Sequence, residues 1–166
     1  MKGNKMNNDA LMLEEEIMSV ALSEAMCGAA MGEIPVGAVI VKDGEIIAKA
    51  HNLRENGGGA TAHAEIVAIN EASKKLGSWR LSGCELYVTL EPCPMCAGAI
   101  INSRLDRVVY GAKDPRMGAL GSLIDLNCYP LGHKVKVTGG ILAEESLDLL
   151  RDFFGEMRGL DVGEKN

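Results

Sequence analysis

Apolar side chains change their spacing along the chain, and each spacing predicts a different element. Residues 9–30 carry an apolar residue at every fourth position, the spacing of an amphipathic helix. These residues are Leu13, Ile17, Ala21 and Ala25. Asp9 belongs to the residue types that cap helix N-termini, so we expect the helix to begin there. Residues 36–41 form a continuous apolar run rich in β-branched residues, which indicates a buried strand.

A hairpin and a second helix follow this strand. Residues 42–45 predict the hairpin turn, because their central Asp-Gly pair tolerates the positive φ that such turns require. Residues 45–51 then return as a second strand. A loop over residues 52–60 holds three consecutive glycines, and helical spacing resumes over residues 64–76. Gly77 is a favoured C-terminal cap for this helix.

The rest of the chain predicts three more strands and two more helices. The strands are expected at 85–90, 106–111 and 133–138, and the helices at 94–102 and 144–157. This alternation favours a three-layer α/β/α fold around a central mixed five-stranded sheet. The chain shows no repeat and no linker, so we expect a single domain over residues 1–166, with loose tails at 1–8 and 159–166.

Charge and hydropathy limit the possible partners. The net charge is −6, and the acidity is concentrated in the first helix, at Glu14, Glu15, Glu16 and Glu24. A nonspecific nucleic-acid binder would carry a basic footprint, so any RNA contact here must be local and directed by shape. The sequence has no apolar run long enough to span a membrane and no signal-peptide pattern at its polar start. We therefore expect a cytoplasmic protein without a membrane partner.

The five cysteines do not form a disulfide framework, because their number is odd and their spacing irregular. Cys27 falls in the first helix and Cys84 opens a strand, so we expect both to be small core residues. Cys128 has no predicted role. Cys93 and Cys96 belong to a Cys-x-x-Cys pattern, which by itself serves redox centres, structural zinc sites and catalytic zinc sites equally well.

Position on the predicted helix adds information about this pair. Pro94 suits the first helical position, which makes Cys93 the N-cap and places Cys96 in the first turn. Both sulfurs would then lie at the positive end of a helix dipole, which favours the thiolate form that binds metals. His63 lies thirty residues before Cys93 and would complete three ligands. Three nitrogen or sulfur ligands leave a fourth zinc position open, as in catalytic sites.

Glu65 follows His63 by two residues, which in a regular helix would point the two side chains apart. Both can face one metal only if His63 lies at the entrance of the helix, and the glycine-rich loop before it makes that possible. Glu65 would then move protons for a zinc-activated water, although an ordinary solvated glutamate is the alternative. The combined pattern H-x-E and P-C-x-x-C is the signature of zinc-dependent nucleobase deaminases.

Beyond these motifs the chain resembles the bacterial tRNA-specific adenosine deaminases over residues 13–158. The resemblance rests on Thr-Ala-His-Ala-Glu-Ile, Thr-Leu-Glu-Pro-Cys-Pro-Met-Cys-Ala-Gly-Ala, residues 36–39, 51–52, 77–81, 107–114 and 121–123, and the pair Phe153-Phe154. It implies a homodimer with the cytidine deaminase fold and one zinc ion per subunit. The implied reaction converts adenosine to inosine at the wobble position of a tRNA anticodon stem-loop, whose loop bases are already unstacked.

The resemblance also implies substrate contacts. Asn52 matches a residue that orients the target nucleoside, and the backbone N–H of Ala64 would touch the base. Asp114 matches a position near a flanking ribose, Phe154 would pack on a flanking base, and Arg158 would lie near phosphate. Simpler roles remain open: a loop cap for Asn52, a turn residue for Asp114, core packing for Phe154 and a solvated charge for Arg158. Glu91, His51 and His133 are expected to be structural or surface residues.

One departure from the family concerns the loop before His63, where Gly59-Ala60 replaces the Asp-Pro of many relatives. This loop flanks the expected substrate pocket, so the departure bears on substrate specificity.

Two rival functions stay open. One is a deaminase of a free base or nucleoside such as guanine, cytosine or cytidine, which the acidic charge mildly favours. The other is a noncatalytic, zinc-stabilised RNA-binding module, which the presence of Glu65 disfavours because a structural zinc site needs no proton carrier.

Overall fold

A five-stranded mixed sheet forms the centre of the molecule. The computed structural model describes residues 2–163, with side chains described for residues 10–159. The strands are β1 (Gly37–Lys42), β2 (Glu45–His51), β3 (Cys84–Leu90), β4 (Arg107–Ala112) and β5 (Lys136–Gly139), in the order β2-β1-β3-β4-β5. β1 pairs antiparallel with both β2 and β3, whereas β3, β4 and β5 run parallel to one another. The predicted mixed five-stranded sheet is therefore confirmed.

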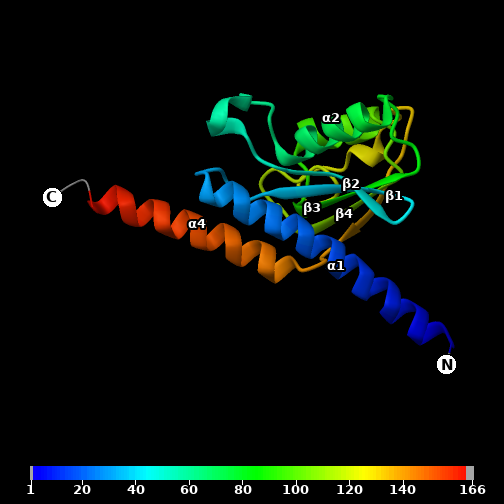
Figure 1. The fold of residues 1–166 in the computed structure, drawn as a ribbon, viewed down its shortest axis with the longest axis horizontal. Helices are drawn as coiled ribbons and strands as arrows, with labels where there is room; N and C mark the ends of the chain where they lie inside the picture. Colours follow the sequence, from blue (N-terminus) through cyan, green and yellow to red (C-terminus); the bar gives the residue numbers. More distant parts are fainter. Residues whose placement is uncertain (1, 164–166) are drawn as a thin grey trace.

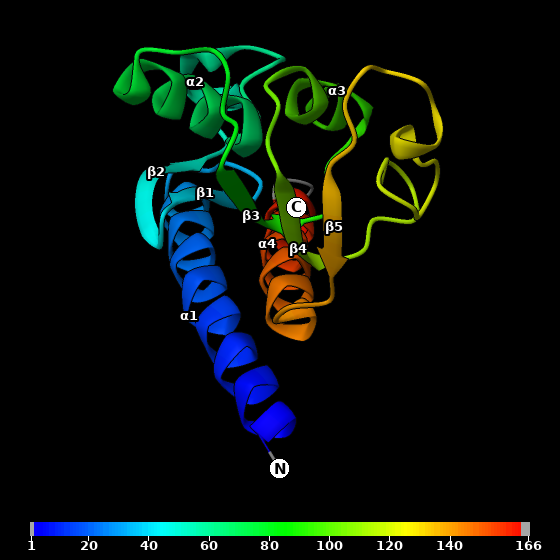
Figure 2. The same cartoon turned by 90° about the vertical axis from the view of Figure 1, so that its right-hand side faces the viewer.

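Helices cover both faces of this sheet. Helices α1 (Lys2–Ala30) and α4 (Ala143–Gly163) lie on one face, and α2 (Ala64–Leu76) and α3 (Pro94–Asn102) on the other (Figure 1 and Figure 2). Each interface has its own apolar cluster, one under α2 and α3 and a smaller one under α1 and α4. The three predicted layers are thus present, and β1 is buried on both faces, as its unbroken apolar run indicates.

A close approach of helix to strand fixes the position of α1. Gly37 opens β1, and a Cβ at this position would overlap the backbone carbonyl of Ala21 in α1. Met18 and Ala21 are fully buried against Val39 of β1 in the smaller cluster. The absence of a side chain at Gly37 therefore lets α1 pack directly on the strand.

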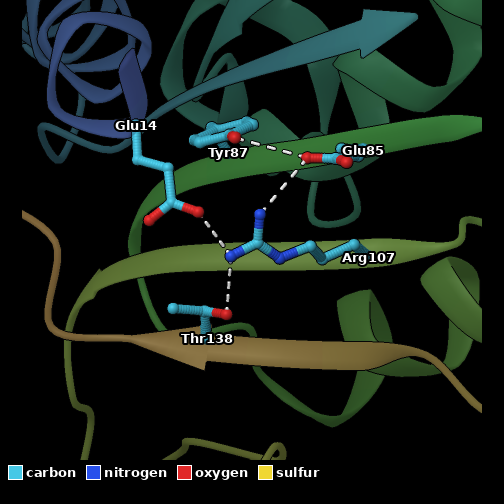
Figure 3. A network of polar contacts seen from close by, with 5 residues as sticks. All are labelled: Glu14, Glu85, Tyr87, Arg107 and Thr138. Atoms are coloured by element: carbon cyan, nitrogen blue, oxygen red, sulfur yellow. Dashed lines mark hydrogen bonds and ion pairs between the residues drawn. The ribbon is translucent and has the colours of Figure 1, made fainter. Parts of the chain in front are cut away.

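An ion-pair network connects α1 to the three parallel strands β3, β4 and β5 (Figure 3). Arg107 of β4 donates from Nη2 to Glu14 Oε1 of α1 at 2.6 Å and to Thr138 Oγ1 of β5 at 2.8 Å. Its Nη1 lies 3.6 Å from Glu85 Oε2 of β3, which also accepts from the Tyr87 hydroxyl at 3.3 Å. Arg107 therefore connects residues far apart in sequence at one end of the sheet.

The first helix differs from its prediction. It begins at Lys2, so Asp9 lies inside the helix and is not its N-cap. Residues 2–8 contain no proline, and nothing in their sequence interrupts the backbone ladder. Leu13 is exposed in a surface groove that Ile17 and Val41 also line. Cys27 is exposed as well, since it lies two positions beyond the buried Ala25 and thus about 200° around the helix.

Smaller differences occur near the C-terminal half. β5 begins at Lys136, three residues later than predicted, because the Asn127 side chain bonds the backbone carbonyl and N–H of Val135, at 2.9 and 3.2 Å, directly before the strand. A short 3₁₀ helix at Leu126–Cys128 was not predicted. The last helix runs to Gly163, beyond the expected end at 157. Cys84 is fully buried, as predicted, whereas Cys128 is exposed.

Candidate active site

The entrance of α2 places His63 and Glu65 as the proposed chemistry requires. His63 is the N-cap residue, with an extended backbone at φ −69° and ψ 153°, so it lies outside the regular helical turns. Glu65 belongs to the first turn and is 4 % exposed. The helix closes at Gly77, whose left-handed conformation (φ 64°) matches the predicted cap. The two motif residues can therefore face the same point despite their spacing.

The Cys-x-x-Cys pair occupies the start of α3. Cys93 is the N-cap residue, with φ −71° and ψ 172°, and Pro94 takes the first helical position. Cys96 follows in the first turn and is fully buried. Both sulfurs thus lie at a helix N-terminus, as predicted from Pro94.

These elements bring three metal-ligating atoms together. His63 Nδ1 lies 3.7 Å from Cys93 Sγ and 3.5 Å from Cys96 Sγ, and all three atoms lie within 4.8 Å of one another. Ideal zinc–nitrogen and zinc–sulfur bonds at a tetrahedral angle would separate nitrogen from sulfur by about 3.6 Å. One nitrogen and two sulfurs are also the donor types that zinc prefers. The three residues therefore fit a zinc ion in position and in chemistry.

The two thiols differ in acidity: the hydrogen bond with Cys93 and burial raise the pKa of Cys96, whereas the pKa of Cys93 is lowered. The hydrogen bond from Cys96 and the neighbouring His63 together lower the pKa of the Cys93 thiol to about 4, against the effect of burial. Burial raises the pKa of Glu65 to about 7. The site thus combines a thiol that ionises easily with a carboxyl group that can hold or release a proton near neutrality.

A cavity of about 300 Å³ opens beside the three ligands. It is lined by Ile34, Val36, Asn52, Arg54, His63, Glu65, Leu90, Glu91, Cys93, Asp114 and Met117. Asn52 and Asp114, two residues singled out from the sequence, thus face the same space as the ligands and Glu65. The cavity is large enough for a nucleobase and is reached from the carboxyl end of β3.

Asn52 is fixed by two hydrogen bonds at the cavity wall. Its Oδ1 accepts from the backbone N–H of Ala64 at 3.0 Å, and its Nδ2 donates to the Ile34 carbonyl at 3.1 Å. The Ala64 N–H, expected to touch the base, therefore bonds to Asn52 in this structure. Asn52 joins the loop after β2 to the start of α2, and within the described residues its Nδ2 uses one of its two hydrogens.

Asp114 combines a turn role with a position in the cavity wall. Its Oδ1 accepts from the backbone N–H groups of Arg116 and Met117 at 3.0 and 3.1 Å. Glu91, which is 2 % exposed, accepts from the backbone N–H groups of Asp114 at 3.1 Å, Leu120 at 3.2 Å and Ser122 at 3.0 Å. The buried Glu91 carboxylate thereby holds the whole loop after β4, in agreement with its predicted structural role.

The C-terminal residues lie apart from the cavity lining. Phe154 is 43 % exposed on α4 and stacks edge-to-face on Phe153, with ring centroids 5.6 Å apart. It is not a core residue, so its exposed ring is free to meet a partner. Arg158 is exposed on the same helix.

Two residues of this region were not singled out from the sequence. Arg54 lines the cavity from the loop after Asn52. Glu33 is fully buried between α1 and β1 and bonds to the same loop. Two sequence signals could have identified them. Arg54 follows Asn52 by two positions, and Glu33 is a single acidic residue directly before the apolar Ile34-Pro35-Val36 run.

Comparisons with known proteins agree with the geometry. Residues 12–112 match the family described as the cytidine and deoxycytidylate deaminase zinc-binding region. The chain is 51% identical to the tRNA-specific adenosine deaminase of Bacillus subtilis (strain 168) over 146 residues, covering 87% of this chain and 91% of that protein.

Two solved structures share the fold. One comes from work described as a study of A-to-I editing by tRNA:A34 deaminases at the wobble position of transfer RNA. It is 43% identical to this chain, with a TM-score of 0.79. It covers 81% of this chain and 99% of its own. The other, a guanine deaminase from Nitrosomonas europaea, is 29% identical with a TM-score of 0.73. It covers 84% of this chain and 83% of its own.

Proposed function

The chain belongs to the cytidine and deoxycytidylate deaminase family and, within it, to the tRNA-specific adenosine deaminases, and we propose that it converts adenosine to inosine at the wobble position of a tRNA anticodon. The observation that carries this proposal is the shared cavity, in which the zinc ligands, Glu65 and Asn52 face one another. A noncatalytic RNA-binding module would have no use for a buried Glu65 at this place.

His63, Cys93 and Cys96 would hold one zinc ion per subunit. Bound zinc supplies an electrophilic centre at which water becomes a stronger acid near neutral pH. The Glu65 carboxylate takes a proton from the attacking water and gives it to a ring nitrogen of adenine. After the oxygen has bonded to C6, Glu65 takes the remaining proton of the added hydroxyl and delivers it to the exocyclic amine. The C6–N bond then breaks and C6 becomes a carbonyl, so that adenosine and water become inosine and ammonia.

The other cavity residues would hold the nucleoside. Asn52 offers its second Nδ2 hydrogen to the adenosine, and its bond to Ala64 keeps the amide next to the entrance of α2. Asp114 forms the opposite wall beside a flanking nucleotide. Phe154, exposed on α4, would stack on a further base of the loop. Arg158 on the same helix would lie near phosphate.

Exposed apolar residues support a homodimer. Several large ones occur on α3 and on the segment after β4: Met95, Met117, Leu123, Ile124, Tyr129 and Leu131. Covering such residues is a common reason for self-association. Analytical ultracentrifugation tests this part: a dimer mass is expected, and a monomer at micromolar concentration would contradict it.

The partner would be the anticodon stem-loop, and the compartment the cytoplasm. The acidic net charge of −6 favours a contact limited to this loop rather than a broad electrostatic grip. Among the described helices none is long and apolar enough to cross a membrane.

The specificity is tested by moving the adenosine. Purified protein is incubated with an anticodon stem-loop that carries adenosine at the wobble position, and with matched stem-loops that carry it one nucleotide to either side. Inosine is located by mass spectrometry. We expect it only at the wobble position. Equal conversion at all three positions would contradict wobble specificity, and no conversion of any stem-loop would contradict the tRNA substrate.

A further inference from the structure

Glu33 is a fully buried carboxylate in the connection between α1 and β1. Within residues 10–159, its charge is met by N–H donors rather than by a basic side chain. Burying a carboxylate without partners costs free energy, and the hydrogen bonds that Glu33 accepts offset that cost.

Three of those hydrogen bonds come from one short segment. Glu33 Oε1 accepts from the backbone N–H of Glu55 at 2.9 Å, from the backbone N–H of Asn56 at 2.9 Å and from Asn56 Nδ2 at 2.8 Å. Asn56 Nδ2 also donates to the Met31 carbonyl at 3.1 Å. The end of α1 is thereby bonded to a loop more than twenty residues further along the chain.

That loop has little else to hold it. The turn Arg54–Gly58 contains no buried residue, and Gly57 adopts φ 93°. The loop closes on itself through the Gly58 N–H, which donates to the Leu53 carbonyl at 2.8 Å. Because the turn contains no buried residue, its position depends on the three bonds that Glu33 accepts and on the bond from Asn56 to the Met31 carbonyl.

The turn begins at Arg54, and Arg54 lines the catalytic cavity. We propose that Glu33 is a positioning residue, which holds the turn Arg54–Gly58 in place so that Arg54 faces the substrate at the cavity. This inference rests on the proposed function for the identity of the substrate. The loop anchor itself is a property of the fold and can be measured without any substrate.

The positive charge of Arg54 indicates that loss of Glu33 should weaken substrate binding rather than slow the chemical step. Arg54 is exposed at the cavity, so its cation can meet the anionic backbone of an RNA loop. Glu33 is not among the residues that line the cavity with Glu65. Burial alone would raise the pKa of Glu33, but the hydrogen bonds from Asn56 and Glu55 outweigh it and hold the pKa below its usual value. The carboxylate thus stays an acceptor at neutral pH.

Three variants test the anchor. Glu33→Ala removes all three bonds, whereas Glu33→Gln retains an Oε1 acceptor and replaces only Oε2, which has no partner within the described structure. Glu55→Ala is the matched control, because it alters an exposed side chain on the same turn and leaves the backbone N–H in place. Amide hydrogen exchange at Glu55 and Asn56 is measured in each protein without substrate.

The same proteins are then assayed on the wobble-adenosine stem-loop. For Glu33→Ala we expect exchange at both amides to rise by about tenfold or more, and KM to rise about tenfold while kcat changes less than about threefold. Glu33→Gln should stay closer to wild type, and Glu55→Ala should match it. Arg54→Ala should raise KM similarly, and the double variant with Glu33→Ala should be no worse than either single variant.

The possible outcomes distinguish failure of the positioning role of Glu33 from failure of the proposed function. Unchanged exchange in Glu33→Ala, or a fall in kcat with KM unchanged, would overturn the positioning role, as would additive effects with Arg54→Ala. If Glu33→Ala does not fold, Asn56→Ala removes the side-chain donor from the loop and is judged by the same criteria. If wild type converts no stem-loop, the proposed function fails, and the exchange data alone then decide whether Glu33 anchors the turn.

Discussion

The backbone N–H of Ala64 donates to Asn52 Oδ1 at 3.0 Å, so the first turn of α2 is bonded directly to the loop that follows β2. This contact joins the helix that carries Glu65 to Asn52, which also lines the cavity. Its loss would leave a buried N–H without a partner and would loosen the space in which a nucleoside is held.

Replacing Asn52 should therefore weaken both substrate binding and the fold. Asn52→Ala is expected to lower kcat/KM on the stem-loop by a factor on the order of 10 to 100, and to lower the free energy of unfolding by about 1–3 kcal/mol. Asn70→Ala, an exposed asparagine on α2, serves as the control. Urea denaturation and steady-state kinetics provide the two measurements. Wild-type kinetics in Asn52→Ala would remove it from the site.

Glu65 should be required for turnover and dispensable for zinc. Glu65→Ala is expected to retain stoichiometric zinc and a folded circular-dichroism spectrum, while kcat falls by a factor on the order of 10² to 10⁴. Glu71→Ala on the exposed face of the same helix should behave as wild type. Activity of Glu65→Ala close to that of wild type would contradict its role as proton carrier.

Removing one sulfur ligand should lower zinc content and stability together, because metal binding contributes to the folding free energy. Cys96→Ser is the sharper variant, since Cys96 is fully buried at the start of α3. Cys128→Ser alters an exposed cysteine and should change neither quantity. Metal analysis by mass spectrometry and thermal denaturation report the result. Stoichiometric zinc in Cys96→Ser would rule out the ligand assignment.

The Arg107 network should stabilise the fold without affecting chemistry. Its β3 member, Glu85, lies about 17 Å along the strand from Leu90, which lines the cavity. Arg107→Ala is expected to lower the free energy of unfolding by about 1–3 kcal/mol, since it leaves Glu14 half-buried and unpaired. Arg151→Ala, in an exposed pair with Asp148, is the control. A fall in kcat in folded Arg107→Ala would contradict this prediction, because it would show that the network affects the active site.

Glu33 should make stability depend on pH. Its pKa in the folded protein is held below its usual value of 4.5, so its ionised form stabilises the fold above that pH. This contribution is lost as the pH falls from 4.5 through the folded-state pKa. The difference in unfolding free energy between wild type and Glu33→Gln should therefore shrink at acid pH. A difference that stays constant between pH 7 and pH 3 would contradict this account.

Local sequence signals predicted much of this architecture. Gly77 and Pro94 mark helix ends through their own backbone preferences, so α2 and α3 were placed within the bounds that the structure shows. The prediction that Asp9 caps the first helix was wrong, because a residue type that favours N-caps is also tolerated inside a helix. The anchoring role of Glu33 could not be predicted, since its donors lie on Glu55 and Asn56, more than twenty residues away, and only the fold brings them together.

The central claim is tested most directly by competition in a single reaction. The protein is given equal concentrations of the wobble-adenosine stem-loop, free adenosine, cytidine and guanine, and every product is quantified by mass spectrometry. We predict inosine in the stem-loop, with the free compounds unchanged while the stem-loop is converted. Preferential conversion of guanine or of a free nucleoside would retain the zinc chemistry and contradict the tRNA substrate.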